Sequence, residues 1–289
     1  MSLANPSEMN VGHMATLACL LEATTPKPGN VHRGADFEDM TYYDVMSSAV
    51  AIAPVMCRAP SRSVGQTVLE AVQATRQVTS VNTNLGTILL LAPLASVPSD
   101  TRCVRGIAAV TANLTVVDTE LVYEAIRLAN PSGLGASDKH DVHEPATVDL
   151  ATAMAMAADR DLVARQYADH FVTVFEEVAG RIAFLVTRGW SIIKSIIHVH
   201  LELMSRYPDS LIARKCGEAR AQESSDRASI ALASGPAGST EYEESLRDFD
   251  FWLRSDGNRR NPGTTADLIA AGIFVALRDR LIRPPLSWK

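Results

Sequence analysis

The sequence has little cysteine, no long apolar run and no cluster of basic residues. Its four cysteines, Cys19, Cys57, Cys103 and Cys216, are scattered and form no Cys-x-x-Cys pair. That spacing favours free thiols in a reducing compartment over disulfides or a zinc site. The lack of a membrane-spanning apolar run and of a signal-peptide pattern argues against a membrane or secreted protein. We therefore expect the protein to be cytoplasmic.

Basic residues are also too dispersed to suggest a nucleic-acid-binding face. The chain has no run of five or more basic residues, and its formal net charge is −6. Proteins that bind nucleic acid usually carry a basic face, so we expect no nucleic acid among the partners. An anionic substrate would have to be bound by local lysines and arginines rather than by the overall charge.

What the sequence does have is an ordinary globular composition with helical periodicity. Hydrophobic residues make up 47% and charged residues 21% of the 289 residues, as in typical globular proteins. Apolar side chains recur at helical spacing, most clearly in residues 11–21, 64–78 and 162–175. Residues 196–203 alternate like a strand, but no partner strand is apparent, so we interpret them as a buried helix. We predict an all-α fold, a single multihelical domain over residues 10–289, preceded by a flexible leader over residues 1–9.

A dense polar loop follows the first predicted helix. It contains Pro26, Lys27, Pro28 and Gly29, and then further polar residues up to Asp39. Each proline fixes its own φ and restricts the residue before it, so Lys27 is held on a stiff loop. Gly29 permits a sharp turn or a close approach to a ligand. The alternative, a helix–helix connector with a solvated charge cluster, remains open at this point.

Two further polar segments interrupt the apolar pattern. Residues 82–86, Asn-Thr-Asn-Leu-Gly, precede an apolar helix, so their N–H groups are expected at a helix N-terminus, which attracts anions. The alternative is an ordinary Asn or Thr cap. Residues 131–145 contain His140, Asp141 and His143, but their spacing fits no strong zinc signature, and a solvated loop is the alternative to a metal site.

Several charged residues in the second half of the chain have a structural interpretation, and four of them also have a functional one. Asp161 and Arg165 share a helix face at i, i+4, which predicts a surface ion pair or a ligand contact. Arg214 and Lys215 are adjacent cations, suited to a polyphosphate or to a solvated helix face. Asp267 is expected in the first turn of the last helix, where a carboxylate suits the helix dipole without any functional role.

Several of these segments together resemble the triphosphoribosyl-dephospho-CoA synthase family over nearly the whole chain. The matching motifs are Glu22-x-x-x-Pro26-Lys27-Pro28-Gly29-x-Val31 with Asp39-Met40, Asn82-Thr83-x-x-Gly86, Gly133-Leu134-Gly135 with Asp141-Val142, Asp159-Arg160-Asp161 with Arg165-Gln166-Tyr167, Pro208-Asp209 with Arg214-Lys215-x-Gly217, and Asn261-Pro262-Gly263 with Ala266-Asp267-Leu268. Many members have His-Lys where this chain has Asn84-Leu85, and an Arg-Gly-Glu stretch found in some members is missing. The chain therefore resembles a divergent member.

The resemblance implies a transferase that moves the triphosphoribosyl group of ATP to the 2′-hydroxyl of 3′-dephospho-CoA and releases adenine. Such a reaction needs cations for the triphosphate, Mg²⁺ held by carboxylates and phosphates, and a carboxylate beside an oxocarbenium-like centre. The attacking hydroxyl group also needs a base, and the departing adenine benefits from an acid. The catalytic candidates are Glu22, Asp39 and Asp141, among which the sequence assigns no individual roles. The magnesium candidates are Asp36, Asp39 and Asp141. The candidates for binding ATP and the other substrate are Lys27, Asn30, Arg33, Asn82, Thr83, Arg160, Arg165, Arg214, Lys215 and Asn261.

Two other functions stay open from the sequence. One is a related ribosyl or phosphoribosyl transferase that uses ATP with another acceptor in cofactor biosynthesis. The other is a nucleotide-binding protein without turnover. In each case the expected partners are small molecules with magnesium, and a homodimer is an alternative to a monomer.

Overall fold

The computed structural model describes residues 9–131 and 142–288, so most of the predicted leader and Asp141 lie outside the described residues. Within those two ranges the regular structure is helical, with two isolated β-bridges, His32–Ala35 and Phe37–Met40, and no strand. The all-α prediction is therefore confirmed. None of the described helices is both long enough and apolar enough to cross a membrane.

Most of the described helices are joined by short connections, but a longer loop over residues 25–41 separates α1 from α2. The first half contains α1 (Val11–Thr24), α2 (Tyr42–Ala51), α3 (Ala53–Arg58), the 3₁₀-helix η1 (Ala59–Ser61), α4 (Val64–Arg76), α5 (Leu85–Ser96), α6 (Cys103–Ala112) and α7 (Val116–Ala129). The second half contains α8 (Leu150–Ala155), α9 (Leu162–Ala168), the π-helix η2 (Thr173–Gly180), α10 (Arg181–Thr187), α11 (Ile192–Arg206), α12 (Ser210–Cys216), α13 (Glu218–Ala233), α14 (Thr240–Arg254) and α15 (Gly263–Arg278).

Local sequence signals explain several helix boundaries. Asn10 and Ser63 each accept a hydrogen bond from a backbone N–H in the first turn of the helix that follows. Thr41 forms a reciprocal capping box with Asp44 at the start of α2. The stretch 196–203 lies inside α11, as expected, although it alternates like a strand. His200, one of the polar residues of this alternating stretch, is fully buried. The burial of the stretch therefore does not follow its alternation of polar and apolar residues, and tertiary packing decides its structure.

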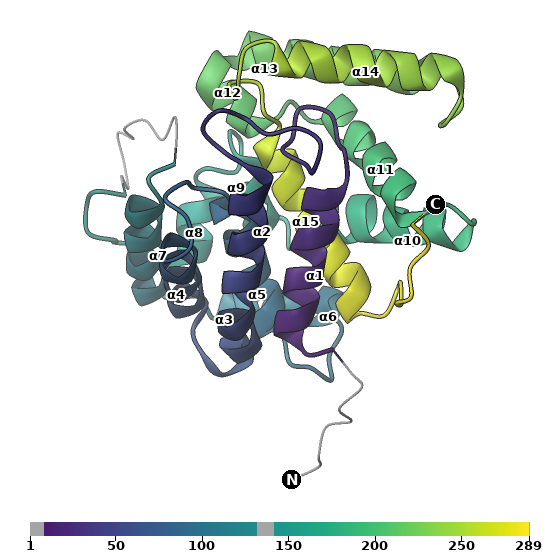
Figure 1. Ribbon diagram of the computed structural model, residues 1–289. Helices are drawn as coiled ribbons and strands as arrows, with labels where there is room; N and C mark the ends of the chain where they lie inside the picture. Colours follow the sequence, from purple (N-terminus) through teal and green to yellow (C-terminus); the bar gives the residue numbers. More distant parts are fainter. Residues whose placement is uncertain (1–8, 132–141, 289) are drawn as a thin grey trace.

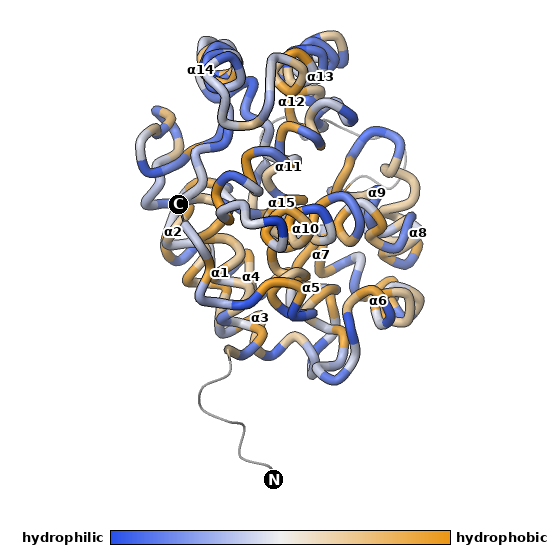
Figure 2. The backbone as a smooth tube through the Cα atoms, turned by 90° about the vertical axis from the view of Figure 1, so that its right-hand side faces the viewer, coloured by the Kyte–Doolittle hydropathy of each residue, from blue (hydrophilic) through white to orange (hydrophobic). Residues whose placement is uncertain are grey.

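The main hydrophobic core surrounds α15, which runs through the middle of the molecule (Figures 1 and 2). This helix packs against α1, α5 and η2, and its residues from Leu268 to Leu277 are almost completely buried. Gly272 permits the close contact with η2, since a Cβ at this position would lie 2.2 Å from a methyl carbon of Val178. The result is one helix surrounded by others, which is why it lacks a polar face.

A second, smaller hydrophobic cluster joins α11 to α12, α13 and α14, which lie across one end of the molecule (Figure 1). The loop after α1 reaches this cluster. Gly29 has a φ of 74°, and its N–H donates to Asp250 at 2.7 Å. A side chain at Gly29 would collide with Leu253, which lies 2.7 Å from the Cβ position. Of the two roles that the sequence left open for Gly29, the structure shows the sharp turn, which docks the loop on α14.

Candidate active site

A cavity of about 750 Å³ lies where segments far apart in the sequence meet. Its walls come from the end of α1, from the loops that precede α5, α9 and α15, and from parts of α7, α8 and α12. Part of the lining is apolar, with Leu89, Val122, Ile126 and Met154. The rest carries carboxylates, amides and cations. Such a mixed lining fits an organic ligand that has both charged and apolar parts.

Most of the residues singled out from the sequence line this one cavity. They come from widely separated stretches of the chain: Glu22, Asn30, Asp39, Asn82, Thr83, Arg160, Arg214, Lys215 and Asn261. Two of them are bonded directly, because Asn30 Nδ2 donates to Asn261 Oδ1 at 2.8 Å. This bond connects the loop after α1 to the loop before α15.

Lys27 lies behind the cavity wall rather than in it. The side chain is completely buried, and Nζ lies 2.7 Å from Oε1 of Glu22. Nζ also donates to the main-chain oxygens of Glu22 at 2.6 Å and Thr25 at 3.4 Å. The ammonium therefore fixes the last turn of α1 and holds the Glu22 carboxylate at the cavity. A direct contact between Lys27 and a ligand, the role expected from the sequence, does not fit this burial.

Other candidates also lie away from the cavity. Arg33 is exposed, and Asp36 accepts a hydrogen bond from the Tyr42 N–H at 2.6 Å and faces a neighbouring open hollow. Arg165 lies over the ring of Tyr207, with its guanidinium carbon 5.9 Å from the ring centroid. Its Nε donates to a main-chain oxygen, that of Ala158. Asp141 falls outside the described residues.

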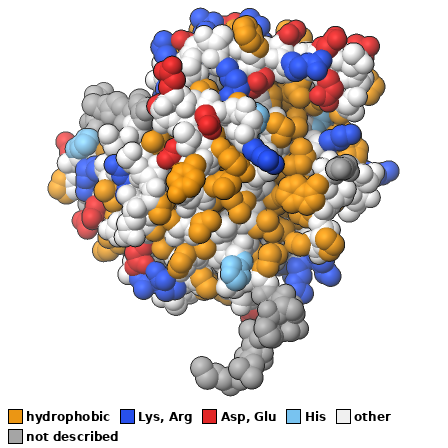
Figure 3. Space-filling model, in the orientation of Figure 1, with side chains coloured by type: hydrophobic (Ala, Val, Ile, Leu, Met, Phe, Trp, Pro, Cys, Tyr) orange, Lys and Arg blue, Asp and Glu red, His pale blue; other side chains and the backbone are white. Residues whose placement is uncertain are grey.

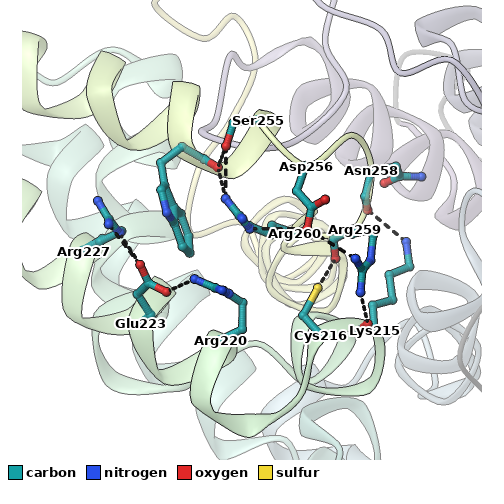
Figure 4. Close-up of polar contacts among 11 residues, drawn as sticks. Lys215, Cys216, Arg220, Glu223, Arg227, Ser255, Asp256, Asn258, Arg259 and Arg260 are labelled. Carbon is teal, nitrogen blue, oxygen red and sulfur yellow. Dashed lines mark hydrogen bonds and ion pairs between the residues drawn. The ribbon is translucent and has the colours of Figure 1, made fainter.

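The cations at the cavity are fixed by partners from other segments. Arg214 pairs with Asp161, so the ion pair expected between Asp161 and Arg165 is replaced by one that joins α12 to the start of α9. Lys215 Nζ donates to the main-chain oxygen of Asn258 at 3.1 Å, and burial lowers the pKa of this lysine. Arg259 in turn donates to the main-chain oxygen of Lys215 (Figure 4). These contacts hold the end of α12 against the loop that precedes α15.

Asp39 faces both the cavity and the open hollow beside it. Both of its carboxylate oxygens accept from Asn258 Nδ2, at 3.0 and 3.1 Å. One amide therefore orients the carboxylate while leaving its remaining lone pairs for a ligand.

The N-terminus of α5 also reaches the cavity. Asn82 Oδ1 accepts the Leu85 N–H at 3.2 Å, whereas Asn84, directly before the helix, makes no side-chain cap bond there. Thr83 donates to the hydroxyl of Ser48 at 2.6 Å, which ties this loop to α2. The segment thus combines an ordinary Asn cap with N–H groups of a first helical turn at the cavity wall.

Asp267 lines the cavity, although its expected place at the start of the last helix suggested only a structural role. α15 begins at Gly263 without a side-chain cap, so Asp267 lies one turn inside the helix and not in its first turn. Thr87 Oγ1 donates to Asp267 Oδ1 at 2.6 Å. Burial is the main cause of a raised pKa at Asp267, the Thr87 hydrogen bond opposes it, and the carboxylates of Glu22 and Asp209 add to it. Together these influences raise the pKa of Asp267 from 3.8 to about 8. This carboxyl group is therefore protonated at neutral pH.

A family model described as ATP:dephospho-CoA triphosphoribosyl transferase matches residues 8–284. The chain belongs to this family. The resemblance inferred from the motifs is thereby confirmed, and so is the identity of the protein as a transferase. Members of the triphosphoribosyl transferase family use ATP and dephospho-CoA as small-molecule substrates.

The fold agrees with this membership. A crystal structure from Archaeoglobus fulgidus, provisionally named a triphosphoribosyl-dephospho-CoA synthase, superposes with a TM-score of 0.64 at 27% sequence identity. The match covers 81% of this chain and 98% of that chain. None of the curated proteins compared matches this chain.

The raised pKa of Asp267 in this transferase predicts a particular dependence of stability on pH. The group binds a proton in the folded state between pH 3.8 and about 8 that it has lost in the unfolded state. Its contribution to the free energy of unfolding is complete below pH 3.8, and it is lost as the pH rises through the folded pKa near 8. The loss reaches about 1.4 kcal/mol per pH unit.

Asp267→Asn removes this pH-dependent contribution to the free energy of unfolding. The melting temperature of the variant should therefore rise relative to that of the wild type as the pH increases. Thermal unfolding at about pH 6 and about pH 9 measures the difference. Asp100→Asn, a change at an exposed carboxylate, serves as the control and should show no such trend. An equal effect of Asp267→Asn at both pH values would show that Asp267 is not protonated in the folded protein.

Proposed function

We propose that the cavity binds ATP and dephospho-CoA side by side and is the place of triphosphoribosyl transfer. The observation that carries the proposal is the meeting of polar residues from Glu22 to Asn261 in one cavity of about 750 Å³. Apart from the motif at residues 133–142, most of which lies outside the described residues, the motifs that resemble the family contribute residues to its polar wall. An apolar wall completes it, as a substrate with a nucleobase and a pantetheine arm requires.

The triphosphate is assigned to the cationic part of the wall. Arg160, Arg214 and Lys215 line the cavity, and guanidinium and ammonium groups are the usual partners of phosphate oxygens. The N-terminus of α5 adds backbone N–H groups and the positive end of a helix dipole. These N–H groups partly replace the positive charge of the lysine that many family members have at Leu85 in the Asn-Thr motif.

Magnesium fits the site as a companion of the nucleotide. In the described part of the chain, no three His, Cys, Asp or Glu side chains are grouped so that they could hold a metal ion unaided. Magnesium at nucleotide sites usually takes one or two carboxylates and completes its shell with phosphate oxygens and water. Asp39 offers an oriented carboxylate of this kind. We propose Asp39 as the ligand, and the bound ion would neutralise charge on the triphosphate.

Glu22 is proposed to act at the reacting ribose. Its carboxylate is oriented by Lys27 and lines the cavity. A carboxylate beside C1′ stabilises the positive charge that develops there and takes the proton of an attacking hydroxyl. The fixed ion pair preorganises the group for this task.

The proposal is tested by measuring free adenine after incubation with ATP and magnesium. Adenine should form when dephospho-CoA is added and should not form without it. Adenine release that requires a different hydroxyl acceptor would support the related transferase instead. ATP binding by calorimetry without adenine release from any acceptor would support a nucleotide-binding protein. The variant Glu22→Gln keeps the size of the side chain and removes its charge, so it should bind ATP and release little adenine.

The cationic wall gives a prediction with an internal control. Arg160→Gln should weaken ATP binding about 10- to 100-fold, because a charge-assisted contact is lost. Arg165→Gln should leave ATP affinity unchanged, because its guanidinium lies over Tyr207 away from the cavity. Calorimetric titration of ATP into both variants makes the comparison. Equal weakening by the two substitutions would contradict the assignment of the triphosphate to this wall.

A homodimer and a cytoplasmic location remain predictions. Figure 3 shows hydrophobic side chains gathered on the face that carries α1 and α2. On α2, Tyr43 is 72% exposed and Val50 is 59% exposed, and exposed apolar side chains gathered on one face are typical of an interaction surface. Sedimentation of the purified protein measures whether it associates.

A further inference from the structure

We propose that Asp267 is the general acid that protonates adenine as it leaves. This inference rests on the proposed function, since it assigns one step of the transfer reaction to a residue of the same cavity. Adenine is a poor leaving group as an anion. A proton delivered to a ring nitrogen while the C1′–N9 bond breaks allows it to leave as the neutral base.

The geometry places the carboxyl group of Asp267 between two fixed neighbours at the cavity. Thr87 Oγ1 donates to Oδ1 at 2.6 Å, which orients the group and leaves Oδ2 as the site for a proton. Oδ2 occupies the space beside Gly86 at the start of α5, because a Cβ on Gly86 would lie only 2.0 Å from it. Asp267, Thr87 and Gly86 all line the cavity. The acidic group is thus held in one position and is accessible to a ligand.

Charged groups from the surrounding helices favour the protonated form. Burial is the main cause of the raised pKa, and Glu22 of α1, Asp209 before α12 and Asp161 before α9 each raise it further. Cys19 of α1 also lies within electrostatic reach, and burial keeps it a neutral thiol by raising its own pKa. The Thr87 hydrogen bond is the opposing influence. With a pKa of about 8, the Asp267 carboxyl group is protonated at neutral pH and can still release its proton.

The two carboxyl groups of the cavity are held in different environments. Glu22 lies against the Lys27 ammonium at 2.7 Å, a partner suited to a carboxylate. Asp267 has a hydroxyl partner and three carboxylates within electrostatic reach. Paired carboxyl groups in contrasting environments divide the roles of acid and base. We therefore assign the base role to Glu22 and the acid role to Asp267.

The step balances with these two residues. The C1′–N9 bond breaks with its electron pair going to adenine, and the Asp267 O–H gives its proton to a ring nitrogen. The 2′-hydroxyl oxygen of dephospho-CoA forms the new bond to C1′ and passes its proton to the Glu22 carboxylate. Asp267 ends ionised and Glu22 ends protonated. Transfer of that proton from Glu22 to Asp267 through cavity water restores both, so the net proton on adenine comes from the acceptor.

The experiment compares the pH dependence of adenine release in the wild type and two variants. Wild-type kcat should fall as the pH rises above about 8, because the Asp267 carboxyl group is then deprotonated. Asp267→Asn should lower kcat about 100- to 10,000-fold and abolish this alkaline limb. Calorimetry should show unchanged ATP affinity. Thr87→Val removes the opposing hydrogen bond, so it should move the alkaline limb to higher pH while the variant remains active.

Failure of the inference can be told apart from failure of the proposed function. If the wild type releases adenine and Asp267→Asn does so at a similar kcat, the transfer reaction stands and the acid role is overturned. If the wild type releases no adenine with dephospho-CoA, the proposed function falls and the acid role falls with it. Infrared difference spectra of wild type against Asp267→Asn provide a readout without turnover. They should show a protonated carboxyl group at neutral pH, and its absence would overturn the inference in either case.

Discussion

Replacement of Lys27 with methionine is expected to destabilise the fold by about 3–5 kcal/mol, because it leaves one partner of a buried ion pair alone. Lys27 is completely buried, and its partner Glu22 is only 13% exposed in its side chain. The methionine fills most of the same space, so the loss comes from the unpaired carboxylate and from main-chain acceptors that lose their donor. Unfolding in denaturant measures the change.

The double variant Lys27→Met with Glu22→Gln tests the cause. It removes both charges of the pair, so it should recover much of the lost stability. It should not recover adenine release, because the carboxylate at the cavity is gone. A single variant Lys27→Met that is as stable as the wild type, with weaker ATP binding, would restore the interpretation in which Lys27 contacts the phosphates itself.

Gly86→Ala is expected to lower kcat about 100-fold, because displacement of a reacting group by about 1 Å has effects of that size. The new methyl group would lie 2.0 Å from Asp267 Oδ2, so the carboxyl group must move. The backbone at Gly86 is helical, and alanine itself is favourable there. The loss should therefore appear in kcat with little loss of stability.

The same substitution in an Asp267→Ala background is the matched control. Without the carboxyl group the methyl group has room, so Gly86→Ala should cause no further loss of kcat or of melting temperature. Gly34→Ala, in the exposed part of the loop after α1, should be neutral in the wild type. If Gly86→Ala is equally harmful with and without Asp267, the contact between the two residues is not the cause.

The sequence predicted the helical fold and most of the cavity wall because those features depend on local patterns. Helical spacing of apolar residues identified α1, α4 and α9, and the sharp turn at Gly29 followed from its lack of a Cβ. The motifs before α5, α12 and α15 came together because loops that precede packed helices can converge at one end of a bundle. The acid and base roles, magnesium and the triphosphate contacts stay predictions.

What the sequence did not predict depends on the direction of side chains in the folded chain. Lys27 looked like a phosphate ligand, but its side chain turns back to the carbonyl groups at the end of α1. Arg160 and Arg165 are five residues apart, yet only Arg160 lines the cavity. Asp267 seemed to serve the helix dipole because it was expected in the first turn of the last helix, whereas α15 begins at Gly263 and Asp267 lies one turn inside it. In each case packing between distant segments decides the outcome.

The central claim is that this cavity transfers an intact triphosphoribosyl group. A single turnover with ATP labelled at the γ-phosphate, magnesium and dephospho-CoA tests it most directly. The label should move to dephospho-CoA, with one adenine released for each labelled product and no free phosphate. Label found in phosphate, with ADP formed and no adenine, would contradict the account.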